Sequence, residues 1–126
     1  MMETVCCLKG NIRIASPSSI FKIRKVMYDM KNLGKLKALG EGSEKAMKAF
    51  WAFDQAALAE GAIPKKYKEL MAIAVALTTQ CPYCLEIHKD AAIAAGATQE
   101  ELAEVTMVSA ALRAGAAVVH GTHLMK

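Results

Sequence analysis

The chain has 126 residues, a formal net charge of +4, and a composition that is 54% hydrophobic but only 6% aromatic. This length fits one domain, and the mild charge comes without a recognisable nucleic-acid-reading element, so we expect no nucleic-acid partner. Ala, Leu and Met are strong helix formers and supply much of the apolar content, which favours an all-α fold. A mean hydropathy of +0.22 in so short a chain favours a homo-oligomer.

We expect neither a targeting segment nor a membrane span. Residues 1–16 lack the continuous apolar stretch of a signal peptide. The longest apolar run, residues 70–77, is far shorter than the ~20 residues that a spanning helix needs. The sequence therefore predicts a cytoplasmic protein, and cysteines in that compartment are more often catalytic, redox-active or metal-binding than structural.

The chain is expected to divide into a flexible N-terminal tail, residues 1–16, and a single helical domain, residues 17–126. The tail holds the adjacent Cys6 and Cys7. Neighbouring Cα atoms are about 3.8 Å apart, which is below the usual disulfide range. We therefore interpret these cysteines as two free thiols.

The first half of the domain is predicted to hold two helices. The first starts after Pro17, carries apolar residues at helical spacing to Leu33, and is bent or interrupted at Gly34. The sequence Gly-Glu-Gly at 40–42 predicts a break, with Ser43 as the N-cap of the next helix, about 44–60. The apolar and aromatic stripe of this second helix is interpreted as core packing. It consists of Ala46, Met47, Phe50, Trp51, Phe53, Ala57 and Leu58.

The second half is predicted to hold three more helices, at about 64–79, 82–95 and 99–118. Pro64 suits the first position of its helix, and Gly96 suits the residue after a helix end. The sequence Thr-Gln-Glu-Glu at 98–101 predicts a capping box, and residues 120–126 are expected to be frayed. The first of these helices should bury a stripe formed by Leu70, Ile73, Ala74 and Leu77. Short connections predict about five helices that pack as antiparallel neighbours.

The stretch QCPYCLEIH, residues 80–88, holds the candidate chemistry. If Cys81 is the N-cap of the helix that starts at Pro82, Cys84 and His88 lie one turn apart on one face. The positive end of the helix stabilises a thiolate, more at Cys81 than at Cys84. A histidine one turn away can accept the Cys84 proton, and a second cysteine can resolve a sulfenic acid into a disulfide.

Other interpretations of this stretch remain open. A metal site would need a fourth ligand besides the two cysteines and His88, and His120 or His123 could supply one. The cysteines could also be packing residues. Glutaredoxins share Cys-Pro-Tyr-Cys, but their motif follows a β-strand, whereas helix-forming residues precede Cys81 here. We reject that resemblance on context.

A wider pattern resembles the carboxymuconolactone decarboxylase and alkyl hydroperoxide reductase D superfamily. Residues 64–105, about a third of the chain, match a glutamate, eleven intervening residues, C-x-x-C-x-x-x-H, and then A-x-x-x-G-A-T-x-E-E. The matching residues are Glu69, Cys81, Cys84, His88, Gly96, Ala97, Thr98, Glu100 and Glu101. The resemblance implies an all-helical bundle that assembles as a homotrimer or homohexamer.

The resemblance also implies functional roles. In the branch that has the cysteine pair, Cys84 would attack a hydroperoxide, Cys81 would close the disulfide, and His88 with Glu69 would relay protons. The resemblance implies that the activity needs no metal or cofactor. It also implies that a dithiol protein, lipoyl-type by analogy, is the reductant. Without it, Glu69 reads as an ordinary ion-pair partner of Lys65 or Lys66.

One position departs from the pattern. Where the reductase itself has a histidine before the second cysteine, this chain has Tyr83. A phenol with an ordinary pKa of about 10 is not a base at neutral pH. The proton relay and the electron donor of this chain therefore need not be those of the reductase. Two alternatives to a peroxidase remain: a lyase that acts on a small cyclic acid, and a non-enzymatic oligomeric module whose thiols bind metal.

Overall fold

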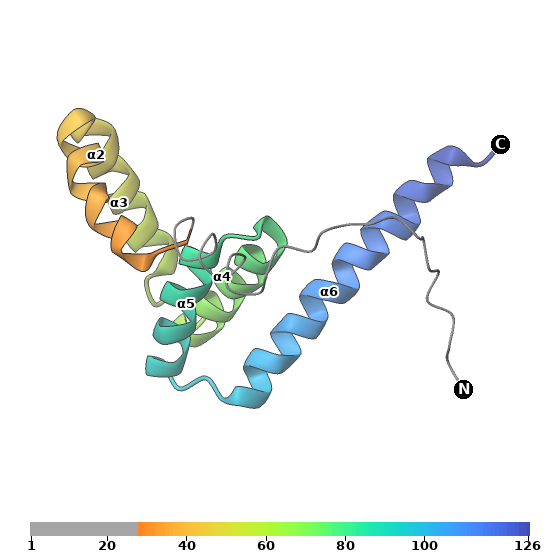
Figure 1. Ribbon diagram of the computed structural model, residues 1–126. Coiled ribbons are helices and arrows are strands. Elements are labelled where there is room, and N and C mark those ends of the chain that lie inside the picture. Colours follow the sequence, from red (N-terminus) through yellow and green to blue (C-terminus); the bar gives the residue numbers. More distant parts are fainter. Residues whose placement is uncertain (1–27) are drawn as a thin grey trace, which may run out of the picture.

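The computed structural model describes residues 28–126, which form helices and no strand, so the predicted all-α fold is confirmed (Figure 1). The predicted tail, Cys6, Cys7 and the helix start after Pro17 lie outside the described residues. In chain order the elements are η1 (Met30–Lys35), α2 (Leu36–Gly42), α3 (Glu44–Leu58), α4 (Lys65–Thr79), α5 (Pro82–Ala94), α6 (Gln99–Gly121) and η2 (Thr122–Leu124).

The helices form three parts along the chain (Figure 1). Helices α2 and α3 make a hairpin on one side, α4 and α5 pack together in the middle, and α6 packs on α4 with its first half before it extends away. The core lies where α4, α5 and α6 meet. Its buried members are Leu70, Ile73 and Ala92, and the half-buried Leu77, Leu85, Ala97, Leu102 and Val105 pack against them.

Two tight turns set the position of α5, the helix that starts with the cysteine motif. Gln80 ends α4 in the left-handed region, with φ of 57°, and Gly96 follows α5 with φ of 87°. Gly96 has no Cβ and adopts this conformation at little cost. The predicted capping box is present: Thr98 Oγ1 accepts from the N–H of Glu101 at 3.2 Å, and the Glu101 carboxylate accepts from the N–H of Thr98 at 2.9 Å.

The predicted break between two helices is present, but it falls at Ser43, directly after residues 40–42, and Ser43 is the N-cap residue of α3 as predicted. Helix α2 continues through Gly42, and the chain turns at Ser43, which precedes α3 without a capping hydrogen bond from its side chain. Packing does not require glycine at either position, since a Cβ at Gly40 would make an ordinary contact of 3.5 Å with Met47 Cγ and one at Gly42 would meet nothing within 4 Å. Upstream, Met30–Lys35 form a 3-10 helix rather than part of a long α-helix.

The structure also corrects the predicted frayed C-terminus. Helix α6 runs to Gly121, and η2 follows directly. The many alanines in this segment favour helix. Thr122 closes the end, because its Oγ1 donates to the carbonyl of Val119 at 2.7 Å. At the start of α4, Pro64 is the N-cap rather than the first helical residue.

Residues Gln99–Leu124 are long and apolar enough to cross a membrane, by length and composition only. The expectation of no membrane span was based on uninterrupted apolar runs, and polar residues are dispersed along this segment. Only 6% of its 18-residue apolar window is buried. Helices of this length and composition also occur in soluble proteins, so these two properties by themselves do not place the helix in a membrane.

Apolar side chains remain exposed on this helix, which leads to a first prediction. Leu112 is 71% and Val118 74% exposed, as are Met107, Val108 and Val119 at more than half, and several exposed apolar side chains on one element are typical of interaction sites. We expect light scattering to give a homo-oligomer, three or six times the 13.5 kDa chain. Leu112→Asp should lower that mass, because burying an unpaired carboxylate in an interface is costly. A stable 13.5 kDa species at micromolar concentration would contradict the prediction.

Candidate active site

The cysteine pair lies at the start of α5, where local sequence fixes its geometry. Cys81 is the N-cap, with extended backbone, and Pro82 occupies the first helical turn. The Cys81 Sγ accepts from the backbone N–H of Cys84 at 3.4 Å. Both cysteines are free and half-buried, and their sulfur atoms are 2.7 Å apart. The predicted cap is confirmed, and it brings the two thiols into direct contact.

The two thiols have opposite pKa shifts. The pKa of Cys81 is lowered, first because the Cys84 thiol donates to its sulfur and then because the backbone N–H groups of Cys84 and Tyr83 point at it. The pKa of Cys84 is raised to about 11, mainly by that same hydrogen bond and then by burial and by the charge on Cys81. The expected thiolate at Cys81 agrees with this arrangement. The expected lowering of the Cys84 pKa is wrong for the dithiol state, because the two thiols share one hydrogen bond.

Glu69 and His88 form the second pair of the site. Glu69 lies on α4, is 3% exposed, and its Oε2 is 2.8 Å from Nδ1 of His88 on α5. The alternative ion pair with Lys65 or Lys66 is wrong. Lys66 instead contacts Glu101 of α6 at 2.7 Å, and Glu69 points into the α4–α5 contact. A carboxylate that accepts from Nδ1–H leaves Nε2 of a neutral imidazole as the acceptor.

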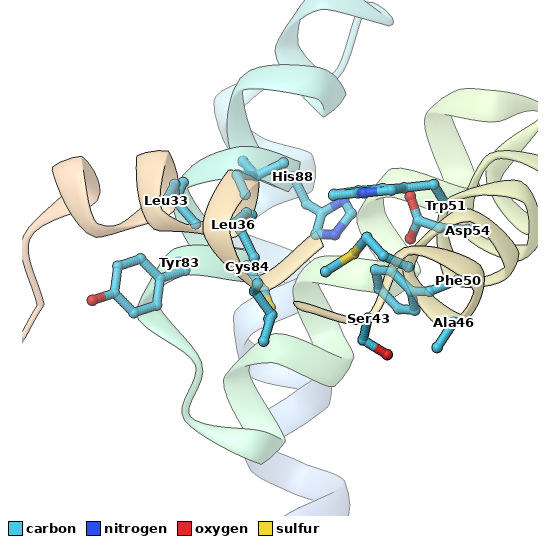
Figure 2. A pocket seen from close by; sticks show the side chains of 13 residues that line it. Leu33, Leu36, Ser43, Ala46, Phe50, Trp51, Asp54, Tyr83, Cys84 and His88 are labelled. Atoms are coloured by element: carbon cyan, nitrogen blue, oxygen red, sulfur yellow. The ribbon is translucent and has the colours of Figure 1, made fainter. Parts of the chain in front are cut away.

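A cavity of about 620 Å³ opens beside Cys84 and His88, both of which line it (Figure 2). Its walls come from η1, α2, α3 and α5 and are mostly apolar. The other lining residues are Leu33, Leu36, Leu39, Ser43, Ala46, Met47, Phe50, Trp51, Asp54, Tyr83 and Ile87. Cys81 does not belong to this wall. Cys84 is therefore the sulfur that a molecule in the cavity would meet.

The cavity corrects the interpretation of the stripe on α3 as core packing. No residue of α3 is buried, and Phe50 and Trp51 are 52% and 42% exposed. Their rings contact each other at 5.3 Å between centroids and face the cavity (Figure 2). Sequence reasoning also missed Asp54. The available signal was an acidic residue seven positions after Met47, on the same helical face as Phe50 and Trp51.

Tyr83, the residue between the cysteines that departs from the family pattern, also lines the cavity. Its hydroxyl oxygen accepts from Nδ2 of Asn32, in η1, at 3.2 Å. Its ring lies edge-on to Tyr28, with centroids 6.3 Å apart. Tyr83 thus links the segment before α2 to the cysteine motif. Its role in this arrangement is to position that motif.

Comparison with known proteins identifies the family of this chain. Residues 44–126 match the carboxymuconolactone decarboxylase family. The chain belongs to that family. This match begins with α3 and includes all four predicted site residues, so it covers the α3 and α5 walls of the cavity and the cysteine motif but not the part lined by η1 and α2.

The chain is also similar to two curated proteins. The chain is 45% identical over 86 residues to a Paracoccus denitrificans protein named "Uncharacterized protein 4 in cox locus", covering 66% of this chain and 78% of that one. A Cupriavidus necator protein is 34% identical over 68% of this chain and 75% of its own length.

Two solved structures share the fold of this family member at 30% identity. A carboxymuconolactone decarboxylase family protein from Legionella pneumophila superposes with a TM-score of 0.60, over 75% of this chain and 80% of that chain. A protein from Methanobacterium thermoautotrophicum superposes with a TM-score of 0.65, over 68% and 97%.

The predicted fourth metal ligands do not join the cysteine pair. His120 and His123 lie near the far end of α6, with ring centroids 5.9 Å apart. Within residues 28–126 no group of three or more His, Cys, Asp or Glu side chains is placed to hold a metal ion. The described part of this family member therefore offers a thiol pair and an acid–imidazole pair.

The shared hydrogen bond gives a second prediction. In Cys81→Ser, the pKa of Cys84 should fall below the value of about 11, because the neighbouring thiolate charge is removed and a serine hydroxyl can donate to the Cys84 sulfur. The measurement is the rate of iodoacetamide alkylation of Cys84 against pH, with peptide mass mapping. In the wild type Cys81 should be alkylated first as pH rises. An unchanged or higher Cys84 pKa in the variant would contradict this electrostatic account.

Proposed function

We propose that this protein is a thiol-dependent hydroperoxidase whose Cys81–Cys84 pair cycles between dithiol and disulfide. The observation that carries the proposal is the 2.7 Å contact between the two sulfur atoms beside an apolar cavity. A thiolate is the nucleophile that attacks peroxides. A sulfur already in contact can trap the sulfenic acid before further oxidation.

The first step oxidises Cys84. The proton of its thiol moves along the hydrogen bond to the Cys81 sulfur, and the Cys84 thiolate attacks the outer oxygen of a hydroperoxide in the cavity. The O–O bond breaks, an S–O bond forms, and the alkoxide leaves as an alcohol after taking the proton from Cys81. Cys84 is then a sulfenic acid, oxidised by two electrons, and Cys81 is again a thiolate.

The second step closes the disulfide. The Cys81 thiolate attacks the Cys84 sulfur, the S–O bond breaks, and hydroxide leaves as water with one proton from solvent. His88 is the proposed carrier of that proton, because its Nδ1 is bound to Glu69 and its ring lines the cavity. A buried carboxylate that accepts from Nδ1–H stabilises the imidazolium while it holds the proton.

Two electrons must then return from outside. By the resemblance to the reductase branch, the electron donor is a dithiol protein, lipoyl-type by analogy. One thiolate of the donor attacks the Cys81–Cys84 disulfide to give a mixed disulfide, and its second thiol releases the reduced pair.

The direct test is a titration of free thiols before and after one equivalent of cumene hydroperoxide, followed by mass mapping. We expect the loss of two thiols per chain and a Cys81–Cys84 disulfide, with formation of one equivalent of cumyl alcohol. Retention of all four thiols of the chain, or an alcohol yield that is independent of Cys81 and Cys84, would overturn the proposal.

The family name also suggests a second function, a lyase that acts on a small cyclic acid. Turnover of such an acid by a variant that lacks Cys81 and Cys84 would support this function.

A further inference from the structure

The wall of the cavity opposite the cysteines carries one carboxylate among aromatic rings. Phe50, Trp51 and Asp54 share one face of α3, since Asp54 lies four residues after Phe50 and three after Trp51. All three line the cavity. Figure 2 shows the Asp54 carboxylate next to the Trp51 ring. The feature combines two π-faces and a negative charge at one place.

The Asp54 carboxylate is available to a ligand. It is half-buried, and within residues 28–126 no hydrogen bond or ion pair engages it. Among the described residues that line the cavity, none is Lys or Arg, and the His88 ring is already bound to Glu69. A charge in a mostly apolar cavity is weakly screened, so its effect on a bound molecule exceeds that of a surface carboxylate.

We infer that Asp54 determines the charge selectivity of this cavity: it accepts apolar molecules with a cationic or neutral end and rejects carboxylic acids. A cation next to Asp54 would pair with the carboxylate and lie against the aromatic faces, which attract cations. A carboxylate there would meet a like charge without a counter-ion from the described wall. This inference deepens the proposed function, on which its statement about substrates rests: alkyl hydroperoxides with neutral or ammonium ends are substrates, and fatty-acid hydroperoxides are excluded.

Binding can be tested without turnover, because Trp51 is the only tryptophan of the chain. Its fluorescence is titrated with octylammonium, octanol and octanoate, which share one alkyl chain and differ in charge. We expect octylammonium to bind about tenfold more tightly than octanol, and octanoate about tenfold more weakly. Asp54→Asn should bring the three dissociation constants together.

Asp90→Asn is the matched control, because Asp90 is an exposed carboxylate on α5 that does not line the cavity. This variant should keep the wild-type order of binding. Protection of Cys84 from iodoacetamide by each ligand, followed by mass mapping, gives a second readout that does not depend on the tryptophan signal. Circular dichroism checks that both variants keep their helix content.

Three results would each overturn the inference. Asp54→Asn could keep the wild-type order of binding, wild-type protein could bind octanoate as tightly as octanol, or neither readout could detect binding. A parallel turnover assay compares cumene hydroperoxide with a fatty-acid hydroperoxide, and Asp54→Asn should raise the relative rate of the acid about tenfold. If neither hydroperoxide is turned over but the binding order holds, the proposed function fails and the charge selectivity of the cavity is still supported.

Discussion

Replacement of Cys84 by serine is expected to abolish hydroperoxide turnover, while replacement of Cys81 leaves a sulfenic acid that can be trapped. The two variants differ because Cys84 lines the cavity and Cys81 does not. A serine hydroxyl is not ionised at neutral pH and cannot replace the attacking thiolate. In Cys81→Ser, the sulfenic acid on Cys84 has lost the sulfur that lies 2.7 Å away in the wild type. That sulfur can then no longer displace the oxygen and form a disulfide.

Two measurements on the purified variants distinguish these outcomes. Turnover of cumene hydroperoxide with excess dithiothreitol should fall to the uncatalysed background in Cys84→Ser. Dimedone labelling followed by mass mapping should find the adduct on Cys84 in Cys81→Ser. A Cys6→Ser, Cys7→Ser double variant is the control, since it removes two thiols outside the predicted pair. Full activity of Cys84→Ser would reject the thiol mechanism, and dimedone on Cys81 in that variant would exchange the roles of the two cysteines.

Replacement of Glu69 by glutamine is expected to lower turnover about 100-fold, within the usual contribution of general acid–base catalysis. The buried carboxylate holds His88 through Nδ1 at 2.8 Å. A neutral amide of the same shape cannot stabilise an imidazolium, and its N–H can donate to Nδ1 and move the imidazole proton to Nε2. The measurement is kcat with cumene hydroperoxide as a function of pH.

Glu86→Gln is the matched control for this prediction. Glu86 lies on the same helix as His88, is exposed, and contacts Lys89 at 2.8 Å. Removal of this exposed charge should leave turnover within about a factor of two, because surface ion pairs contribute little. Equal activity of Glu69→Gln and Glu86→Gln would show that the buried carboxylate has no part in proton transfer.

Local sequence signals predicted the second half of the fold closely. The N-cap role of Cys81, the positive φ of Gly96 and the capping box at Thr98 are each confirmed. Such signals succeed because they depend on backbone groups within a few residues. Composition located the first half less closely: α2 includes Gly40 and Gly42, and the chain turns one residue later, at Ser43.

The sequence by itself determined the all-α class, the helix that starts at the cysteine motif and four candidate residues of the site, since helix periods, caps and motif spacing depend on neighbouring positions. Only the tertiary structure decided what those residues do to one another. The contact of Glu69 with His88 joins two helices, the opposite pKa shifts of the cysteines follow from one sulfur–sulfur contact, and the face of α3 borders a cavity. Each depends on how helices pack, which no spacing along the chain specifies.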